Sequence, residues 1–203
     1  VLFLAKMGVM EGKDAYIREA EKQFRLHAMY LAEPESGLSY TGWSVDGCHN
    51  FARAFWGRGN CWVTIAIPEF LHMVDCAPEV RAQLTAVLQK QAASLMRYQN
   101  ASGMWHTLID DPSSYVESSA TCGFGYGLLR GVRMGLLDVS LESVALKALP
   151  PILDYINEQG VVQQVSYGTP MGRESRDFYK NIEIKPMPYG QALAMLFLIE
   201  CLA

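Results

Sequence analysis

The feature that most constrains the fold is a module that recurs three times along the 203 residues. Each copy joins an amphipathic helix ending in a tyrosine, a Gly-led extended stretch and a helix that is apolar nearly all round. The tyrosines are Tyr30, Tyr98 and Tyr155, and the extended stretches are residues 36–41, 102–107 and 160–162. The first two stretches share the pattern S-G-[L/M]-x-[Y/H]-T. A period of about 60 residues exceeds that of common solenoids and predicts helical hairpins with an inserted loop.

Hydrophobic periodicity assigns the individual helices. A single apolar stripe predicts a helix that faces water on one side, whereas a segment that is apolar all round predicts a buried helix. The amphipathic helices are expected at residues 14–31, 79–98 and 141–156, the last of them broken near Pro150 and Pro151. The buried helices are expected at residues 1–10 (closed by Gly8 or Gly12), 61–73 (with Pro68 as a kink or in its first turn), 118–136 and 189–202, and residues 46–59 are expected to form a loop.

The alternation of the two helix types predicts two layers, with the buried helices inside. Successive hairpins arranged in this way curve into an α/α toroid. The chain is therefore expected to be all-α and to form part of a single domain over residues 1–203. About seven helices are too few to close a ring, so we expect the C-terminal part of a larger barrel.

One of the expected buried helices, residues 118–136, is unusually rich in glycine. Glycine costs roughly 1 kcal/mol per helical site relative to alanine, so its repeated use implies close helix packing. Gly123, Gly127 and Gly131 recur at i+4 spacing and form one stripe. Because these residues fall inside a helix, they predict a packing surface rather than a nucleotide-binding loop.

Charge and cysteine usage exclude several classes of protein. A net charge of -4 and scattered Lys and Arg residues argue against a nucleic-acid partner. Apolar runs fall short of the roughly 18 residues that a membrane span needs, so no membrane partner is expected. Five cysteines without a C-x-x-C pair give neither a zinc signature nor a disulfide framework, and no metal or cofactor is expected. Together with the absence of a secretory signal, this favours a reducing, cytoplasmic location.

Polar motifs stand at equivalent points of the modules, just before apolar helices. They occupy residues 56–62, 110–119 and 185–191. In a two-layer toroid the inner helices begin at the same rim, and their free N–H groups favour anions there. The polar motifs are therefore expected to meet at one rim and to form the binding site.

The sharpest cluster at this rim is Trp56, Arg58 and Trp62. An arginine between two tryptophans could clamp a carboxylate beside aromatic faces that suit a sugar ring. The alternative is that Trp62 lies in the core and Arg58 only forms a salt bridge.

Four further polar residues have a structural explanation beside the functional one. His106 and Tyr115 flank the second rim motif, where a lone histidine near a turn is more often structural. Glu117 can be explained by stabilisation of a helix start. His49 could order its loop as easily as contact a ligand.

Three motifs in order along nearly the whole chain resemble glycoside hydrolase family 105, the unsaturated rhamnogalacturonyl hydrolases. The first runs from Asp46 to Trp62 and includes His49-Asn50-Phe51-Ala52 and Trp56-Gly57-Arg58-Gly59-Asn60-Cys61-Trp62. The second comprises Gly103-Met104-Trp105-His106-Thr107 with residues 111–121, and the third is Pro186-Met187-Pro188-Tyr189-Gly190-Gln191. The related unsaturated glucuronyl hydrolases share the fold and are the group most easily confused with this family.

This resemblance implies an (α/α)6 barrel that removes a 4,5-unsaturated uronic acid from a pectin-derived disaccharide. In such enzymes an aspartic acid protonates the vinyl ether double bond, water adds across it, and the hemiketal collapses to release rhamnose. This is a hydration, unlike the two-carboxylate displacement of most glycosidases. The resemblance implies that Trp56, Arg58 and Trp62 line the sugar subsite. The full set of substrate-binding candidates is Trp56, Arg58, Trp62, Thr41, Trp43, His49, Asn60, His106, Tyr115 and Glu117.

The sequence departs from the family pattern at two points. The family's catalytic aspartate lies on a helix whose tail residues 1–6 resemble, so it is expected just upstream of Val1, and no catalytic residue is assigned within the chain. Thr41 stands where relatives carry a histidine before the Gly-Trp pair. The competing interpretations are a non-catalytic carbohydrate-binding or structural half-toroid and an unsaturated glucuronyl hydrolase; a homo-oligomer is compatible with each.

Overall fold

The computed structural model describes all 203 residues, and its secondary structure is helical. The helices are α1 (Leu2–Glu11), α2 (Asp14–Leu31), α3 (Gly57–Met73), α4 (Pro78–Tyr98), α5 (Ser118–Arg133), α6 (Ser140–Leu146), α7 (Leu149–Asp154), the 3-10 helix η1 (Arg176–Asn181) and α8 (Pro188–Leu202). Extended pairing is confined to isolated β-bridges in the loops. None of the helices combines the length and the apolarity needed to cross a membrane.

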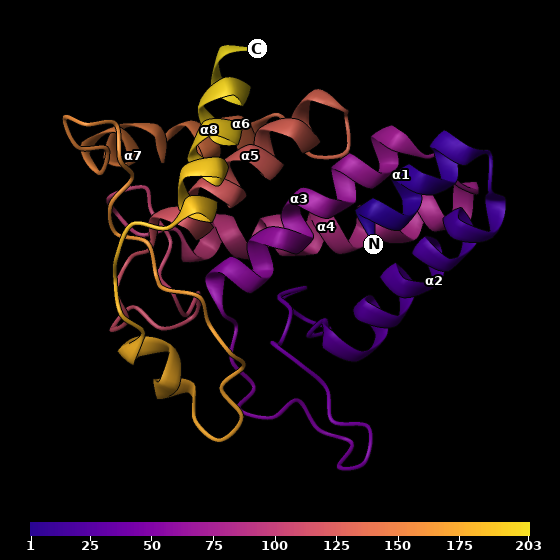
Figure 1. Ribbon diagram of the computed structural model, residues 1–203, viewed down its shortest axis with the longest axis horizontal. Coiled ribbons are helices and arrows are strands. Elements are labelled where there is room, and N and C mark those ends of the chain that lie inside the picture. Colours follow the sequence, from indigo (N-terminus) through magenta and orange to yellow (C-terminus); the bar gives the residue numbers. More distant parts are fainter.

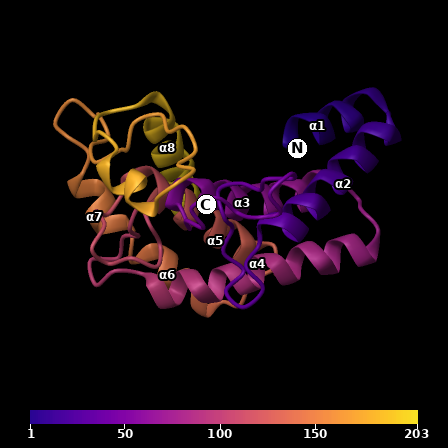
Figure 2. The same ribbon diagram turned by 90° about the horizontal axis from the view of Figure 1, so that it is seen from below.

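The helices form two layers along an arc, as the alternating pattern predicted (Figures 1 and 2). In the inner layer α1 packs on α3, α3 on α5, and α5 on α8. In the outer layer α2, α4 and α6 contact one another in turn, and each covers an inner helix. The glycine-rich α5 is the most deeply buried element, since it has neighbours on both sides in its own layer and one outside.

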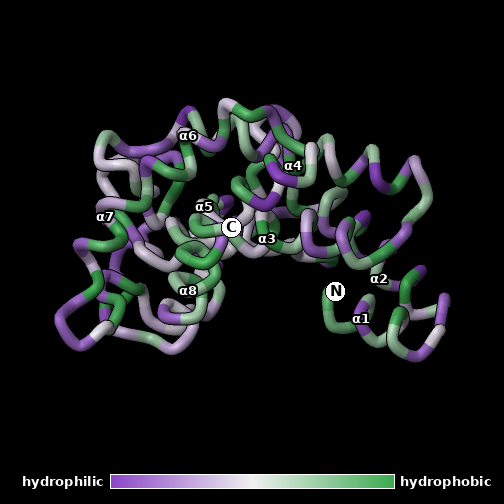
Figure 3. Tube along the Cα trace, turned by 90° about the horizontal axis from the view of Figure 1, so that it is seen from above, coloured by the Kyte–Doolittle hydropathy of each residue, from purple (hydrophilic) through white to green (hydrophobic).

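The two apolar helices at the ends of the arc are only partly covered. Phe3 of α1 is 78% exposed and Leu202 of α8 is 89% exposed. The physical reason is their position, because α1 and α8 each have an inner-layer neighbour on one side only. Figure 3 shows these two helices as the facing ends of the arc.

Two helix boundaries also differ from the sequence prediction. Helix α3 begins at Gly57, four residues before the expected start at Cys61. The Gly57 amide donates a hydrogen bond to the Thr107 carbonyl at 2.8 Å, which fixes the first turn. The outer helix before Tyr155 breaks at Lys147 and Ala148 rather than at the prolines. The prolines lie in the first turn of α7, where a missing amide proton costs no hydrogen bond.

The three modules share one turn geometry, which confirms the repeat read from the sequence. Gly37, Gly103 and Gly160 all have positive φ, at 68°, 96° and 76°. Each donates its amide proton to a carbonyl three or four residues earlier, at 2.8 to 2.9 Å. A residue with a side chain is disfavoured in this conformation, and so the glycine that leads each extended stretch is a requirement of the turn.

The glycine stripe of α5 is closely packed, as its spacing predicted: Gly123 and Gly127 lie against α3, whereas Gly131 lies against Leu137 and Leu88. A Cβ at Gly123 would lie 2.6 Å from the Cys61 sulfur, and one at Gly127 would lie 2.5 Å from the Thr64 carbonyl oxygen. Pro68 deprives that carbonyl of its usual donor four residues later in the helix. The backbone of α5 therefore approaches α3 most closely where Pro68 has freed a carbonyl group.

Replacing Gly127 by alanine is expected to lower the free energy of unfolding by about 1–3 kcal/mol, since the added methyl group overlaps backbone rather than a movable side chain. Thermal or denaturant unfolding measures this loss. Gly168→Ala is the matched control, because Gly168 has ordinary φ and no atom within 4 Å of a built Cβ. Equal stability of the two variants would contradict close packing at Gly127.

Candidate functional site

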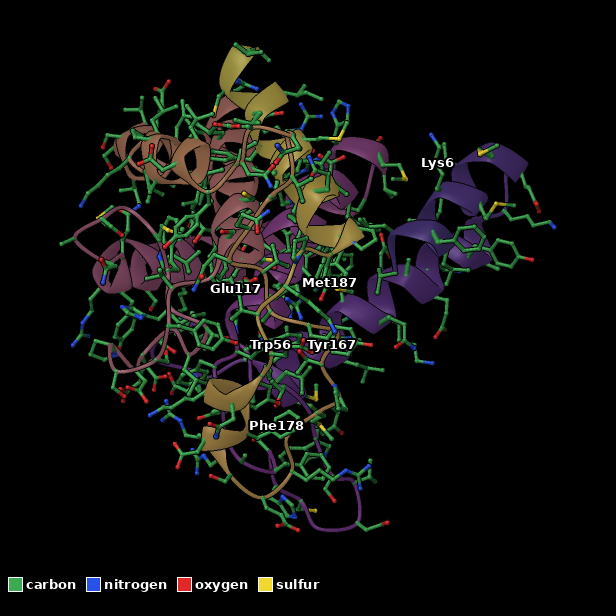
Figure 4. All side chains as sticks on the ribbon, turned by 60° about the vertical axis from the view of Figure 1, so that its left-hand side comes forward. Lys6, Trp56, Glu117, Tyr167, Phe178 and Met187 are labelled. Atoms are coloured by element: carbon green, nitrogen blue, oxygen red, sulfur yellow. The ribbon has the colours of Figure 1, made fainter.

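The starts of three inner helices come together at one rim. The residues that precede their first turns are Trp56 for α3, Glu117 for α5 and Met187 for α8, and all three have extended backbones. Figure 4 shows them close together with Tyr167, whereas Lys6 lies apart on α1 and Phe178 lies on η1. The convergence of the polar motifs at one rim therefore occurs as the two-layer arrangement predicted.

Arg58 occupies the centre of this rim in the first turn of α3. Its side chain is 4% exposed and its guanidinium lies between the rings of Trp56 and Tyr189, at 4.7 and 4.5 Å from their centroids. The second aromatic partner is thus Tyr189 of α8 and not Trp62. Stacking on two rings fixes the plane of the guanidinium.

The two ends of the Arg58 guanidinium have different surroundings. Nη1 donates to Ser119 Oγ at 3.2 Å and to the carbonyl and hydroxyl of Ser166 at 2.9 and 2.6 Å, and all these contacts are buried. Nη2 donates to the Tyr167 carbonyl at 3.2 Å and to Thr169 Oγ1 at 3.1 Å, in a half-buried position. The Nη2 end is therefore the one that lies nearer to solvent.

Glu117 pairs with Arg58 from the start of α5. Its Oε1 lies 3.6 Å from Nη1 of Arg58, and its side chain is 1% exposed. The carboxylate accepts hydrogen bonds from the amides of Ala120 at 2.6 Å and Ser166 at 2.9 Å, and from the Ser119 hydroxyl. The acid thus serves as the N-cap of α5 and also holds the segment around Ser166.

Beside this network lies a pocket of about 690 Å³. One face of α3 forms a wall, and the other walls come from α1, α2, α4, η1 and two loop segments. Its mouth near the helix starts is lined by Tyr40, Thr41, Trp56, Trp62, Thr169 and Tyr179, and its apolar interior by residues such as Phe24, Ala28, Val63 and Ile67. A volume in this range suits a small ligand.

Two lining residues present buried polar atoms that have no partner in the protein. These atoms are Thr41 Oγ1 and Trp56 Nε1. A buried hydroxyl or indole N–H left without a hydrogen bond costs free energy, about 1–3 kcal/mol each, unless a ligand or water satisfies it. Both residues line the pocket, so these two atoms are candidate hydrogen-bond partners for a polar ligand there.

Trp62 lies at the same mouth with 47% of its surface exposed. It is therefore not a core residue. An exposed indole beside hydroxyl groups and an indole N–H is a surface on which a sugar ring can stack. Trp56, Trp62 and Thr41 are thus the predicted site residues that the structure brings to the pocket.

Asn60 and Tyr115 do not line the pocket, but they form hydrogen bonds to segments that do. Asn60 is buried and exchanges two hydrogen bonds with the backbone of Ser39, at 2.7 and 2.9 Å, which holds the segment that carries Tyr40 and Thr41. Tyr115 donates to the Tyr179 carbonyl at 3.2 Å. Burial raises the pKa of Tyr115 and of Tyr189 above the ordinary value, so both hydroxyls remain protonated donors at neutral pH.

Three other predicted residues lie outside the pocket lining. Trp43 packs against Tyr30 with ring centroids 5.3 Å apart. His49 is exposed and accepts the Phe51 amide proton at 3.0 Å, within its own turn. His106 is buried, with Nδ1 2.5 Å from the Ser114 carbonyl and Nε2 3.0 Å from the Asn100 amide. The contacts of both histidines order their loops.

Sequence reasoning did not identify several residues of the pocket mouth. They are Tyr40, residues 169–171, and Tyr179, together with Ser166 and Tyr189 in the Arg58 network. Tyr40 belongs to the repeated S-G-[L/M]-x-[Y/H]-T pattern and Tyr189 to the motif before α8, so both carried a signal. Residues 166–171 have no periodicity or motif that could have indicated their place.

The whole chain, residues 1–203, matches the family model described as Glycosyl Hydrolase Family 88. The chain is 30% identical over 202 residues to the unsaturated rhamnogalacturonyl hydrolase YesR of Bacillus subtilis (strain 168), a match that covers 99% of this chain and 57% of that protein.

Two solved structures resemble the chain in fold. The chain is 48% identical, with a TM-score of 0.95, to a possible member of the GH105 family from Salmonella enterica serovar Paratyphi A, over 98% of this chain and 53% of that one. The unsaturated glucuronyl hydrolase of Bacillus sp. GL1 shares the fold at 18% identity and a TM-score of 0.71, over 96% of this chain and 54% of that one. These likenesses confirm the (α/α)6 fold class and the resemblance to family 105. The chain spans little more than half the length of each of these proteins.

Proposed function

The chain belongs to Glycosyl Hydrolase Family 88, and from this premise we propose that it forms the sugar-binding part of an unsaturated uronyl hydrolase. The substrate we propose is a pectin-derived rhamnogalacturonan disaccharide with a 4,5-unsaturated uronic acid at its non-reducing end. The relative at 30% identity is named for this activity. The enzyme would hydrate the double bond and release the aglycone sugar.

The observation that carries this proposal is the pocket mouth itself. It combines the exposed face of Trp62 with two unpartnered polar atoms, on Thr41 and Trp56, beside a buried guanidinium. Sugar rings present apolar faces and edges of hydroxyl groups, and a uronic acid adds a carboxylate. The mouth offers a partner for each of these features.

Within this proposal, the Nη2 end of Arg58 binds the substrate's carboxylate. Its present partners, the Tyr167 carbonyl and Thr169 Oγ1, are neutral and lie at 3.2 and 3.1 Å. A carboxylate makes shorter and stronger bonds to a guanidinium than neutral acceptors do, so it can replace them. The proton donor we propose is an aspartate of the full protein before Val1, and the residues described above supply binding.

The test is to incubate the full gene product that carries these residues with the unsaturated rhamnogalacturonan disaccharide. We expect loss of the absorbance of the double bond together with release of rhamnose. An unsaturated glucuronyl disaccharide, run in parallel, tests the closest alternative substrate. Calorimetric binding without turnover of either sugar would contradict the hydrolase and support the non-catalytic carbohydrate-binding half-toroid.

A further inference from the structure

Glu117 is 1% exposed and makes more contacts than a helix cap requires. A cap needs one bond to an amide of the first turn, and the Ala120 amide supplies it at 2.6 Å. The same carboxylate also accepts the Ser166 amide proton, from 49 residues along the chain, and faces Arg58. These additional contacts connect α5, α3 and the segment around Ser166.

The contacts of Glu117 and of Arg58 overlap. Ser119 accepts from Nη1 of Arg58 and donates to the Glu117 carboxylate. Ser166 accepts from Nη1 through its carbonyl and hydroxyl and donates its amide proton to Glu117. Tyr189, whose ring covers the guanidinium, donates its hydroxyl proton to the same Ser166 carbonyl at 2.6 Å. Each group that holds Nη1 is therefore also connected to Glu117 directly or through Ser166.

This arrangement fixes one end of the guanidinium within the buried network and places the other end beside the pocket. The Nη1 end is held in the buried network, whereas Nη2 donates to the Tyr167 carbonyl and to Thr169 Oγ1, and Thr169 lines the pocket. The negative charge of Glu117 compensates Arg58 where water is excluded. Without that charge, Nη1 would be less firmly held and the direction of Nη2 less well defined.

From these contacts we infer that Glu117 is a positioning residue for the proposed reaction, which orients Arg58 toward the substrate's carboxylate through Ser119 and Ser166. Glu117 does not touch the substrate in this role. The inference rests on the proposed function, and it assigns to Glu117 a task beyond the stabilisation of a helix start.

The decisive experiment is a double-mutant cycle in the full gene product with the unsaturated disaccharide as substrate. Glu117→Gln keeps an oxygen for the Ala120 amide and removes the charge, and we expect kcat/KM to fall about three- to tenfold. Because Glu117 acts through Arg58, Glu117→Gln should cost little more when Arg58→Lys is already present. Most of the loss should appear in KM, since the residue orients a binding group.

Glu69→Gln is the matched control, because Glu69 also accepts from an arginine and a hydroxyl, Arg130 and Tyr126, but on the inner helices away from the pocket. Its kinetics should equal those of the unchanged protein. Glu117→Asp, which retains a good helix cap and the charge, should recover most of the activity and serves if Glu117→Gln does not fold. Hydrogen exchange at the Ser166 amide should be faster in Glu117→Gln than in Glu69→Gln.

The outcomes separate this inference from the proposed function. Turnover by the unchanged protein, together with effects of Glu117→Gln and Arg58→Lys that multiply independently, would overturn the positioning role and leave the hydrolase in place. Absence of turnover by the unchanged protein would overturn the proposed function, and this inference with it. Coupled effects and a protected Ser166 amide in the unchanged protein would support both.

Discussion

Arg58→Ala in the full gene product is expected to lower kcat/KM for the unsaturated disaccharide by about ten- to a hundredfold. A hydrogen bond to a charged group contributes about 1.5–3 kcal/mol, which corresponds to this range. The variant also leaves Glu117 buried without its ion-pair partner, a change that typically costs about 3–5 kcal/mol of stability. Steady-state kinetics and thermal unfolding should therefore both report the substitution.

Arg58→Lys separates charge from geometry. Lysine keeps a positive charge near Glu117. Its ammonium group lacks the planar set of donors that lets a guanidinium bind Ser166 and a carboxylate at the same time. We expect it to recover most of the stability and only part of the activity. Arg97→Ala is the matched control, because Arg97 also lies over an aromatic ring, that of Tyr98, but is exposed on the outer helix α4. Unchanged kinetics in folded Arg58→Ala would reduce Arg58 to a structural ion pair.

The helices and the packing surfaces could be predicted because their signals are local. The stripe of residues 14–31 has a 3.6-residue period, and the glycines of α5 recur at i+4, so each pattern states which face is covered. The structure shows α2 with the expected bounds, and it shows Gly123 and Gly127 of α5 against α3. Such patterns do not state how many neighbours a helix has: α1 and α8 are as apolar as a buried helix, yet each has an inner-layer neighbour on one side only.

The convergence of the site was predictable, whereas its detailed contacts were not. Three helix starts at one rim follow from the two-layer arrangement, and Trp56 and Arg58 lie there as expected. The ring that covers Arg58 together with Trp56 comes from Tyr189, far along the chain, and no local spacing identifies such a partner. Residues 166–171 reach the pocket through an irregular segment, whose path depends on tertiary contacts such as the bond from the Ser166 amide to Glu117.

The repeated glycine turn links the sequence pattern to the stability of the fold, and Gly103 is its most constrained copy. Its φ is 96°, and a Cβ there would overlap the Lys147 carbonyl oxygen and lie 2.8 Å from the carbonyl carbon. Lys147 is at the break between α6 and α7, so the turn after α4 packs directly on the outer layer of the next module. The segment that follows Gly103 continues to Leu108, which bridges to Trp56.

Gly103→Ala is therefore expected to cost more stability than the same change at the equivalent Gly160. Both substitutions force a side chain into a positive φ, at about 1–2 kcal/mol, and Gly160 has no atom within 4 Å of a built Cβ. Gly103→Ala adds an overlap with backbone worth about 1–3 kcal/mol, for a total of roughly 2–5 kcal/mol. Denaturant unfolding of the two variants side by side measures the difference. Equal losses of unfolding free energy in the two variants would mean that the turn at Gly103 adjusts to the methyl group at no further cost. The contact between the modules at Lys147 would then not constrain the fold.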